Sequence, residues 1–407
     1  MIKQKTEIPT SQPNILWITT DRQRWDTLNC MGNAYVNTPN IDKLARGGAL
    51  FRQAFSQNPV CAPSRASFLT GRYPRTTKLV RNAQTIPQSE RLISRLLADA
   101  GYVCGHTGKM HLSASSPVVT AWSEKRIDDG YSVFDWSMHP PATPVSPYTA
   151  WLYEHNIEFI RKPLPEAAIH ISRENRRMQN EHDMASEDAY VSIGMPKESS
   201  NTSWIVQRAI NFIECSKELQ RPWFFTCDIE DPHSPYDPPE EFLKPYLDKL
   251  DTIPLPRYVE GELENKPPFQ SVDREGVYGS GGGSFAASSM TDQHHRLIRA
   301  AYWAMIDHID YQIGRIIEIL EKTGQRENTI IVFHSDHGDM LGDHGMYMQG
   351  AYFYDEMVHV PLIISYPAKI TGDIVSDALV ELIDIAPTIL EAVGIPIYEG
   401  MQGKSLW

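Results

Sequence analysis

Residues 61–72 read Cys-Ala-Pro-Ser-Arg-Ala-Ser-Phe-Leu-Thr-Gly-Arg, and this stretch predicts a helix that begins with a reactive side chain. Pro63 suits a first helical turn, where its missing N–H is not needed, and Gly71 suits the end of the helix. The first turn of a helix presents unpaired N–H groups and the positive end of the helix dipole, which together favour an anion. Cys61 is therefore a candidate reactive thiol, and Arg65 adds a positive charge one turn further on. The alternative for a single cysteine is a buried structural thiol.

On both sides of this stretch, strand-like segments alternate with amphipathic helical segments. Short runs rich in β-branched and aromatic residues predict buried strands, and apolar residues spaced three or four apart predict helices. The alternation predicts an α/β fold, with a large mainly parallel or mixed sheet flanked by helices on both faces. The predicted strands are residues 14–20, 102–104, 223–228, 329–335 and 360–365, and the main predicted helices are residues 91–100, 204–215, 296–323 and 384–394.

Charged and polar residues follow the predicted strands directly. Asp21, Lys109, His233 and the pair Asp336 and His337 all lie at or just beyond a strand end. Because the carboxyl ends of parallel strands meet at one edge of a sheet, where ligands bind in such folds, we expect one active site there. Carboxylates with one imidazole suit a divalent cation such as Ca²⁺, Mg²⁺ or Mn²⁺. The ordinary alternative is that these residues only stabilise turns.

Several motifs together resemble those of the sulfatases, in the alkaline-phosphatase-like superfamily. The match at Cys61 is Cys-x-Pro-Ser-Arg followed by Leu-Thr-Gly-Arg, and further matches are Thr-Thr-Asp21, Gly108-Lys109-x-His111, Asp231-Pro-His233-x-Pro235 and the segment 334–345. The resemblance implies that a formylglycine-generating maturation enzyme converts Cys61 to formylglycine. It also implies a divalent metal, Ca²⁺ first and Mg²⁺ or Mn²⁺ as alternatives, whose ligands are Asp21, Cys61, Asp336 and His337.

The same resemblance implies a role for each remaining site residue. Arg65 would hold the hydrated aldehyde, Lys109 and His111 would bind the sulfate, and His233 would protonate the leaving alcohol. The implied activity is that of a sulfuric ester hydrolase, which uses a metal-assisted formylglycine nucleophile to cleave an aryl or carbohydrate sulfate monoester. Its partner is then a small-molecule or carbohydrate sulfate ester.

Two positions depart from the family pattern. Arg22 stands where relatives usually carry a second acidic or amide metal ligand, and a guanidinium cannot ligate a cation. Gln349 stands where relatives usually carry a lysine that contacts the sulfate. Our hypothesis is that Arg22 replaces this lysine by contacting the sulfate. The relatives also continue into a small C-terminal subdomain, which we expect to be absent or incomplete here.

These departures keep two alternatives to sulfate hydrolysis open. The first is a phosphonate monoester or phosphodiester hydrolase that uses the same site, because phosphate and sulfate are nearly isosteric. The second is a catalytically impaired sulfatase-like protein that binds sulfated ligands without turnover. Assays with paired aryl sulfate and aryl phosphonate substrates separate the two enzymes.

Composition excludes some partners and suggests a location. The net charge of −13 and the pI near 5.5 argue against a nucleic-acid partner. No apolar run is long enough to predict a membrane span. The five cysteines are widely spaced and the first fourteen residues are polar, so we expect a cytoplasmic protein, with a periplasmic one as the alternative if a leader segment has been removed. We expect a single domain over residues 1–407, in which residues 113–200 and 272–290 are insertion or loop segments that shape the substrate pocket.

Overall fold

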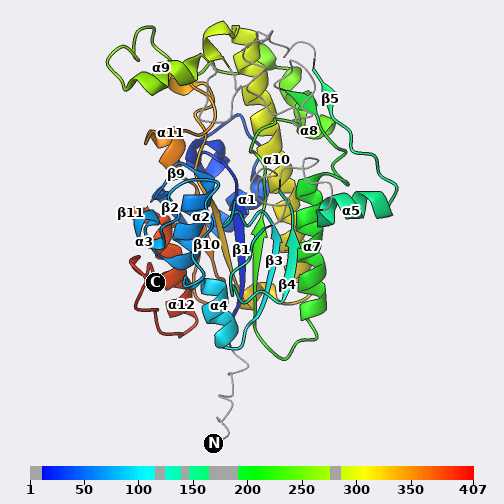
Figure 1. Ribbon diagram of the computed structural model, residues 1–407. Helices are drawn as coiled ribbons and strands as arrows, with labels where there is room; N and C mark the ends of the chain where they lie inside the picture. The colour runs from blue at the N-terminus through cyan, green and yellow to red at the C-terminus, as the bar shows by residue number, and fades with distance from the viewer. Residues whose placement is uncertain (1–11, 115–123, 139–145, 165–190, 276–285) are drawn as a thin grey trace, which may run out of the picture.

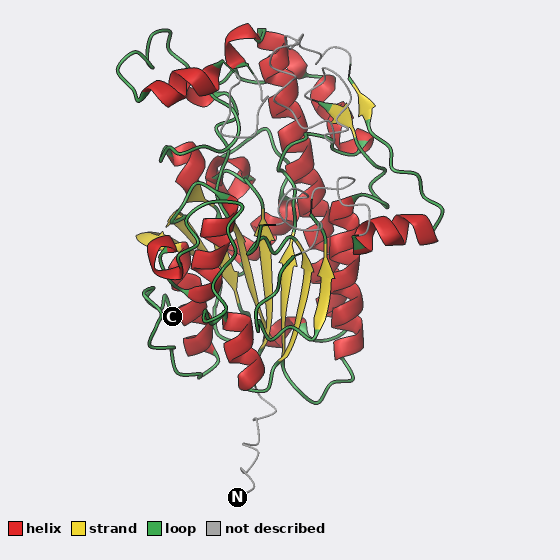
Figure 2. Ribbon diagram, in the orientation of Figure 1, coloured by secondary structure: helices red, strands yellow, loops and turns green. Residues whose placement is uncertain are grey.

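One mixed sheet forms the centre of the chain. The computed structural model describes residues 12–114, 124–138, 146–164, 191–275 and 286–407. Within these ranges, nine strands pair in the order β11-β2-β10-β8-β1-β7-β3-β4, and β9 pairs with β2 (Figures 1 and 2). The strands are β1 Asn14–Thr20, β2 Ala49–Phe55, β3 Val103–Gly108, β4 Val133–Trp136, β7 Trp223–Asp228, β8 Thr329–Ser335, β9 His359–Val360, β10 Leu362–Ser365 and β11 Ile374–Glu381. A separate pair joins β5 Lys162–Pro163 to β6 Ser192–Ile193.

The central strands are parallel and end level with one another. β1 pairs in parallel with β7 and β8, so that Thr19 lies opposite Asp228 and Thr20 lies opposite Ser335. β3 also runs parallel to β7, with Gly108 opposite Asp228. β10 is antiparallel to both β8 and β2, which makes the sheet mixed. The predicted fold class is thereby confirmed, and the carboxyl ends of four strands meet at one edge.

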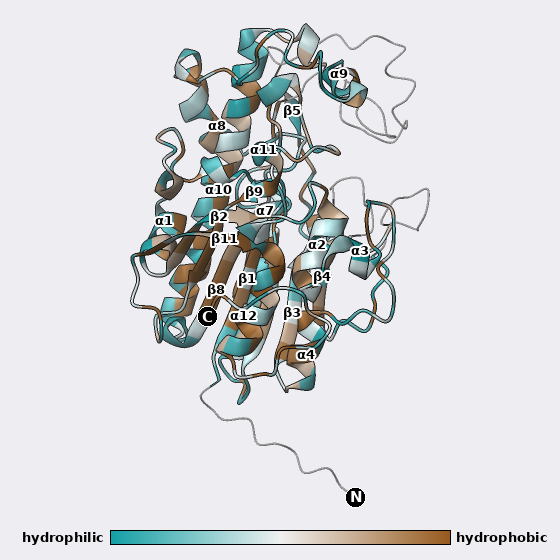
Figure 3. Cartoon of the chain, turned by 90° about the vertical axis from the view of Figure 1, so that its left-hand side faces the viewer, coloured by the Kyte–Doolittle hydropathy of each residue, from teal (hydrophilic) through white to brown (hydrophobic). Residues whose placement is uncertain are grey.

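Helices cover both faces of this sheet. Leu16 and Ile18 of β1 pack on the side of α7 and α10, whereas Ile15 and Trp17 pack on the side of α2, α4 and α12. This alternation follows from the two-residue repeat of a strand whose two faces are both buried. Figure 3 shows the hydrophobic colouring concentrated on the strands. The helices are α1 Pro39–Arg46, α2 Cys61–Thr70, α3 Pro74–Thr77, α4 Ile93–Asp99, α5 Pro147–Glu154, α7 Asn201–Ser216, α8 Glu240–Leu247, α9 Pro268–Arg274, α10 Asp292–Lys322, α11 Asp355–Val358 and α12 Ile385–Ala392.

Most predicted elements are present, with several corrections. The predicted strand 360–365 is divided between β9 and β10, because Pro361 has no N–H to donate. β2 and β11 were not predicted, since β2 carries Arg52 and Gln53 and β11 is largely exposed. The segment 113–200 is not only loop, because β4 joins the main sheet beside β3 and α5 follows it.

Parts of the two proposed insertion segments lie outside the described residues. These parts are residues 115–123, 139–145, 165–190 and 276–285. The described start of the second segment, 272–290, belongs to α9 and is therefore helical rather than loop. Among the described helices, none combines the length and the apolar character that crossing a membrane requires.

Candidate active site

The carboxyl edge of the sheet, toward which the arrowheads of the central strands point in Figure 2, carries charged residues from four strands. Asp21 directly follows β1, Lys109 follows β3, Asp228 ends β7 and Asp336 follows β8. All four side chains are buried. The structure thus brings three of the sequence-predicted residues together at this edge. Asp228 was missed, although it carries the same signal as Asp21, an acidic residue at the end of a buried strand.

Cys61 reaches the same edge from the first turn of α2. The helix covers Cys61–Thr70, and Gly71 ends it with φ of 66°, as predicted. Cys61 is 1% exposed. The Oγ of Ser64 donates a hydrogen bond of 2.6 Å to the carbonyl of Asp336 and thereby ties α2 to the end of β8. Ser64 is a positioning residue that sequence reasoning did not single out.

Four side chains form a compact group of metal-type ligands. One ligand atom from each of Asp21, Cys61, Asp336 and His337 can be chosen so that all four lie within 4.8 Å of one another. The Nε2 of His337 lies 3.2 Å from the Sγ of Cys61, and Oδ1 of Asp21 lies 3.8 Å from that sulfur. Two carboxylates and one imidazole, all buried, are a donor set that fits a divalent cation.

Arg65 is at the centre of the buried charge network. Its Nε lies 2.9 Å from Oδ2 of Asp336, its Nη1 lies 3.2 Å from Oδ1 of Asp228, and its Nη2 lies 3.6 Å from Oδ2 of Asp21. The ammonium of Lys109 forms a further ion pair with Asp21. Buried charges are tolerated only when they are paired in this way.

These pairings set the protonation of the group. Burial opposes the charge of Asp21, but Lys109, His233 and Arg65 together hold the pKa of this carboxyl well below its usual range. Burial also opposes the charge of His337, yet Asp336 and Cys61 raise the pKa of this imidazole to about 9. An imidazole must be neutral to ligate a metal, so binding of a cation by His337 would release a proton.

Lys109 is brought to the site by the turn after β3. Gly108 has φ of 95°, and a Cβ there would lie 1.9 Å from the carbonyl oxygen of Asp228. Only glycine allows this close approach. The N–H of Lys109 then donates to that same carbonyl at 3.0 Å. The Nζ of Lys109 lies 4.0 Å from the Sγ of Cys61, which places a cation beside the candidate nucleophile.

His111 follows in the same loop and is 6% exposed. Its backbone has φ of 55°, in the left-handed region. The next residue, Leu112, donates its N–H to Oε1 of Glu124 at 2.9 Å. Burial raises the pKa of Glu124 to about 7, although the N–H of Leu112 works against this. Glu124 fixes the loop that carries His111, and no sequence signal pointed to it.

His233 lies beside the group, next to a small polar hollow. The hollow has a volume of about 60 Å³, and Asn201 and Glu230 also line it. The Nδ1 of His233 lies 2.6 Å from the carbonyl oxygen of Ser234, so Nδ1 carries the proton and donates it there. Nε2 is then the ring nitrogen that gains or loses the second proton. The position of His233 suits proton exchange with a group bound in the hollow.

The two departures from the motif pattern occupy different places. Arg22 is 2% exposed, and its Nη1 lies 3.5 Å from Oδ2 of Asp339 and 3.5 Å from Oγ of Ser234. Its guanidinium therefore pairs with a carboxylate beside the metal-type group rather than within it. Gln349 lies at the site itself, because its Oε1 is 3.1 Å from the Sγ of Cys61. The side chain of Gln23, the next residue after Arg22, accepts from the hydroxyl of Thr20 and donates to the hydroxyl of Thr27.

The chain is similar to known sulfatases and to a phosphonate monoester hydrolase. A family model described as Sulfatase matches residues 13–395. An arylsulfatase of Clostridium perfringens is 30% identical, over 97% of this chain and 78% of its own length. An N-acetylglucosamine-6-O-sulfatase of Bacteroides thetaiotaomicron is 26% identical, over 99% of this chain and 71% of its own length. A phosphonate monoester hydrolase of Silicibacter pomeroyi has a similar structure, with a TM-score of 0.76 and 26% identity over 97% of this chain and 76% of that one.

Proposed function

Because the chain belongs to the sulfatase family, we propose that it hydrolyses a sulfate monoester of an aromatic or carbohydrate alcohol. One observation carries the proposal. Cys61, at the first turn of α2, lies within 3.2 Å of His337 and 4.0 Å of Lys109, inside a buried group of metal-type ligands. The proposed nucleophile, the proposed metal ligands and a cation that can bind the sulfate are thus next to one another.

The cofactors follow from the family and from the ligand group. Sulfatases use a divalent metal and formylglycine, and the ligand group described above has the donors that a metal requires. We propose Ca²⁺ as the ion, with Mg²⁺ or Mn²⁺ as alternatives, because the carboxylates of Asp21 and Asp336 are hard oxygen donors. A bound metal with a hydrated aldehyde at position 61 supplies an activated hydroxyl nucleophile and polarises the sulfate oxygens.

Side chains of the protein orient the nucleophile, bind the sulfate and supply the proton. Arg65 is fixed by three carboxylates and orients residue 61. Lys109 and His111 bind the sulfate and neutralise the charge that develops as the S–O bond breaks. His233 gives a proton to the leaving alcohol in the adjacent hollow. A formylglycine-generating maturation enzyme is the further partner that this scheme requires.

Gln349 and Arg22 belong to the scheme as substrate-binding residues. The Oε1 of Gln349 accepts from the thiol of Cys61, and rotation of this amide would turn its NH₂ group, a hydrogen-bond donor, toward a sulfate there. Arg22 is 3.5 Å from Ser234, the residue after His233, so it is near the leaving-group side of the site. If Arg22 released Asp339 and bound the substrate instead, its guanidinium would interact with the negative charge of the substrate.

Mass spectrometry of the peptide that contains Cys61 tests the nucleophile directly. The protein is produced together with a formylglycine-generating enzyme, and turnover of 4-nitrophenyl sulfate is measured alongside. We expect an aldehyde at position 61 and turnover that is lost in Cys61→Ala. Cys215→Ser, at an exposed cysteine, is the matched control and should retain both. Aldehyde without turnover of any sulfate ester would favour the binding-protein alternative.

Phosphonate monoester hydrolysis is the second candidate, because the phosphonate monoester hydrolase structure is so similar to this chain. A sulfate monoester and a phosphonate monoester are similar in shape, and each carries one negative charge. A phosphate monoester differs from both because it carries two. Parallel assays with 4-nitrophenyl sulfate and an aryl phosphonate monoester rank them. A higher kcat/KM for the phosphonate would reverse the proposed order.

We also propose a cytoplasmic location. All five cysteines are free thiols in the structure, and free thiols persist in reducing compartments. Cell fractionation with an antibody to the protein measures the location. Recovery in an oxidising compartment would contradict it.

A further inference from the structure

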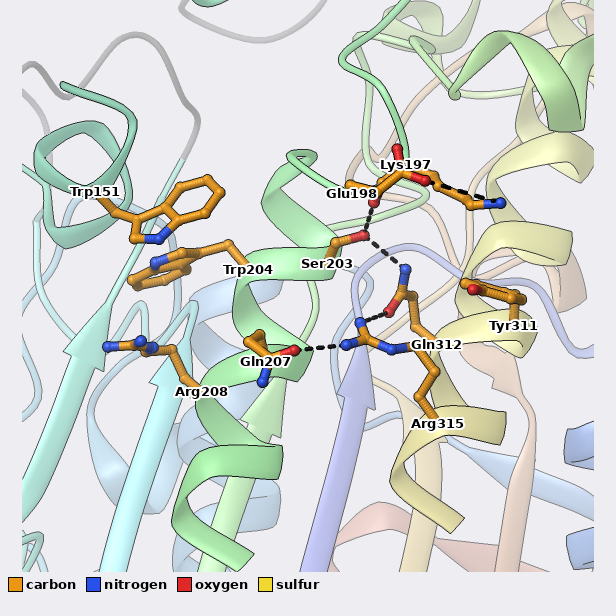
Figure 4. Close-up of a pocket in the computed structure, with 10 residues that line it drawn as sticks. All are labelled: Trp151, Lys197, Glu198, Ser203, Trp204, Gln207, Arg208, Tyr311, Gln312 and Arg315. Atoms are coloured by element: carbon orange, nitrogen blue, oxygen red, sulfur yellow. Dashed lines mark hydrogen bonds and ion pairs between the residues drawn. The ribbon is translucent and has the colours of Figure 1, made fainter. Parts of the chain in front are cut away.

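A second hollow lies away from the metal-type group, on the outer side of α7. It has a volume of about 250 Å³, and its lining side chains come from α5, α7, α10 and the residues before α7 (Figure 4). We call it the outer pocket. Pockets for drug-sized ligands measure about 300–1,000 Å³, so this volume suits a group of monosaccharide size. Its lining residues are Trp151, Lys197, Glu198, Ser203, Trp204, Gln207, Arg208, Tyr311, Gln312 and Arg315.

The outer pocket contains positive charge that is not neutralised by the described residues. Within these, neither Arg208 nor Arg315 has a carboxylate within 4.0 Å. In the part of the chain that the structure describes, Arg315 donates only to neutral amide oxygens, at 2.7 Å to Gln312 and 2.5 Å to Gln207. In a chain of net charge −13, a guanidinium group without a carboxylate partner in a hollow favours an anionic ligand.

A buried polar chain fixes the position of Arg315. The Nε2 of Gln312 donates to Oγ of Ser203 at 2.6 Å, and Gln312 also contacts the ring of His308 at 3.1 Å. Burial lowers the pKa of His308 to about 3, and the positive charges of Lys197 and Arg315 lower it further. The ring is therefore neutral and serves as a structural partner, and the lowered pKa is consistent with a positive potential in the outer pocket.

The aromatic residues supply the other part of a sugar site. Trp204 is 3% exposed, and its indole Nε1–H has no hydrogen-bond partner among the described residues. A buried donor without a partner costs free energy, which a ligand acceptor would recover. Trp151 and Tyr311 also line the pocket (Figure 4). Aromatic faces with nearby hydrogen-bond donors suit the apolar faces and hydroxyl groups of a sugar ring.

From these contacts we propose that the outer pocket binds a sugar ring that carries a carboxylate or sulfate group. Arg208, which lies on the same side of α7 as Trp151 and Trp204 in Figure 4, binds the anionic group, and the indole N–H of Trp204 donates to a ring or hydroxyl oxygen. Trp151 covers an apolar face of the ring. This site is separate from the metal-type group, and its ligand does not need to be a substrate.

Indole NMR signals test the proposal on the full chain. The protein has nine tryptophans, so labelling with ¹⁵N-tryptophan gives nine indole signals, and the variant Trp204→Phe assigns one of them. Addition of glucuronate should move the Trp204 signal, because its N–H gains an acceptor, whereas glucose at equal concentration should not. An unmoved signal with glucuronate, or equal movement with glucose, would overturn the proposal.

Two variants separate the charge from the fold. Arg208→Gln removes a guanidinium that has no carboxylate partner among the described residues, and it should weaken glucuronate binding by about tenfold or more. Arg91→Gln, at an exposed arginine before α4, is the matched control and should leave the affinity unchanged. Equal affinity in both variants would overturn the role of Arg208. Turnover of an aryl sulfate should be the same in both, since neither residue lies at the active site.

A further assay with the same protein tests whether the bound sugar ring is free or part of an oligosaccharide. A uronate oligosaccharide and free glucuronate are each tested as inhibitors of aryl sulfate turnover. If only the oligosaccharide inhibits, and Arg208→Gln relieves the inhibition, the ring is part of a chain that also reaches the active site. If glucuronate binds without inhibiting, the outer pocket holds an independent sugar. Either result supports an anionic-sugar site.

Discussion

The carboxyl edge of the sheet and the outer pocket both contain several cationic side chains, but these side chains have different partners in the two regions. At the sheet edge, Arg65 contacts three carboxylates and Lys109 pairs with Asp21, all of them buried. In the outer pocket, Arg208 and Arg315 have no carboxylate partner among the described residues. The difference indicates that the sheet edge is preorganised by internal ion pairs, whereas the outer pocket keeps its charge available for a ligand.

The strongest test of this difference is removal of the central cation of the network. Arg65→Ala should remove the cation that three buried carboxylates share, with Lys109 left to pair with Asp21, and lower the free energy of unfolding by about 3–5 kcal/mol. Urea denaturation followed by circular dichroism measures the change. Arg65→Lys is the matched control, because it keeps a charge and should lose less. An unfolding free energy equal to that of the parent protein would contradict the preorganised network.

Gly108 offers a second way to break the same edge. Gly108→Ala places a Cβ against the carbonyl of Asp228 in a left-handed backbone, and we expect a loss of about 3 kcal/mol. Gly324→Ala is the matched control, because Gly324 also has a positive φ but a Cβ at that position would meet open space. Thermal denaturation of both variants measures the difference. Equal losses would show that the backbone conformation alone, rather than the contact with Asp228, decides the cost.

Addition of a metal ion tests the difference between the two regions, because the ion is expected to bind at the sheet edge and not in the outer pocket. A cation that binds the folded protein alone stabilises it by about 2.7 kcal/mol at a concentration 100 times its Kd. We expect Ca²⁺ to raise the unfolding temperature, a chelator to reverse this, and Asp336→Asn to abolish it. Asp377→Asn, at an exposed carboxylate, should leave the response intact. A Ca²⁺ response that survives in Asp336→Asn would place the metal elsewhere.

The smallest effect is expected in the outer pocket. Because Arg208 has no ion pair to lose among the described residues, Arg208→Gln should change the free energy of unfolding by no more than about 0.5 kcal/mol. The same denaturation experiment as for Arg65→Ala measures it. A loss comparable to that of Arg65→Ala would mean that Arg208 stabilises the fold and that the contrast between the two regions is wrong.

Much of the fold could be predicted because the central strands are buried on both faces. Residues 14–20, 223–228 and 329–335 are apolar runs, and each begins and ends as predicted. β4 could not be found in this way, because it has only four residues and is partly exposed. Its place in the sheet depends on pairing with β3, which no local pattern encodes.

In the candidate site, too, some residues could be placed from local sequence patterns and others could not. Residues that follow buried strands, such as Asp21 and Asp336, could be placed at one edge from the parallel-sheet rule alone. The direction of the Arg22 side chain could not, because it depends on Asp339, more than three hundred residues further along the chain. Glu124 was missed for a different reason: its contact with Leu112, only twelve residues earlier in the chain, arises only after the loop has folded.

The burial of Cys61 has a consequence for the order of events during synthesis. The thiol is 1% exposed, and one of the side chains that contacts it, Gln349, lies 288 residues later in the sequence. An enzyme that must grip the peptide around position 61 therefore has to act before the later half of the chain folds over it. At a synthesis rate of about 5–20 residues per second, the ribosome needs about 15–60 s to make those residues. This interval is the time in which the chain can receive its proposed modification.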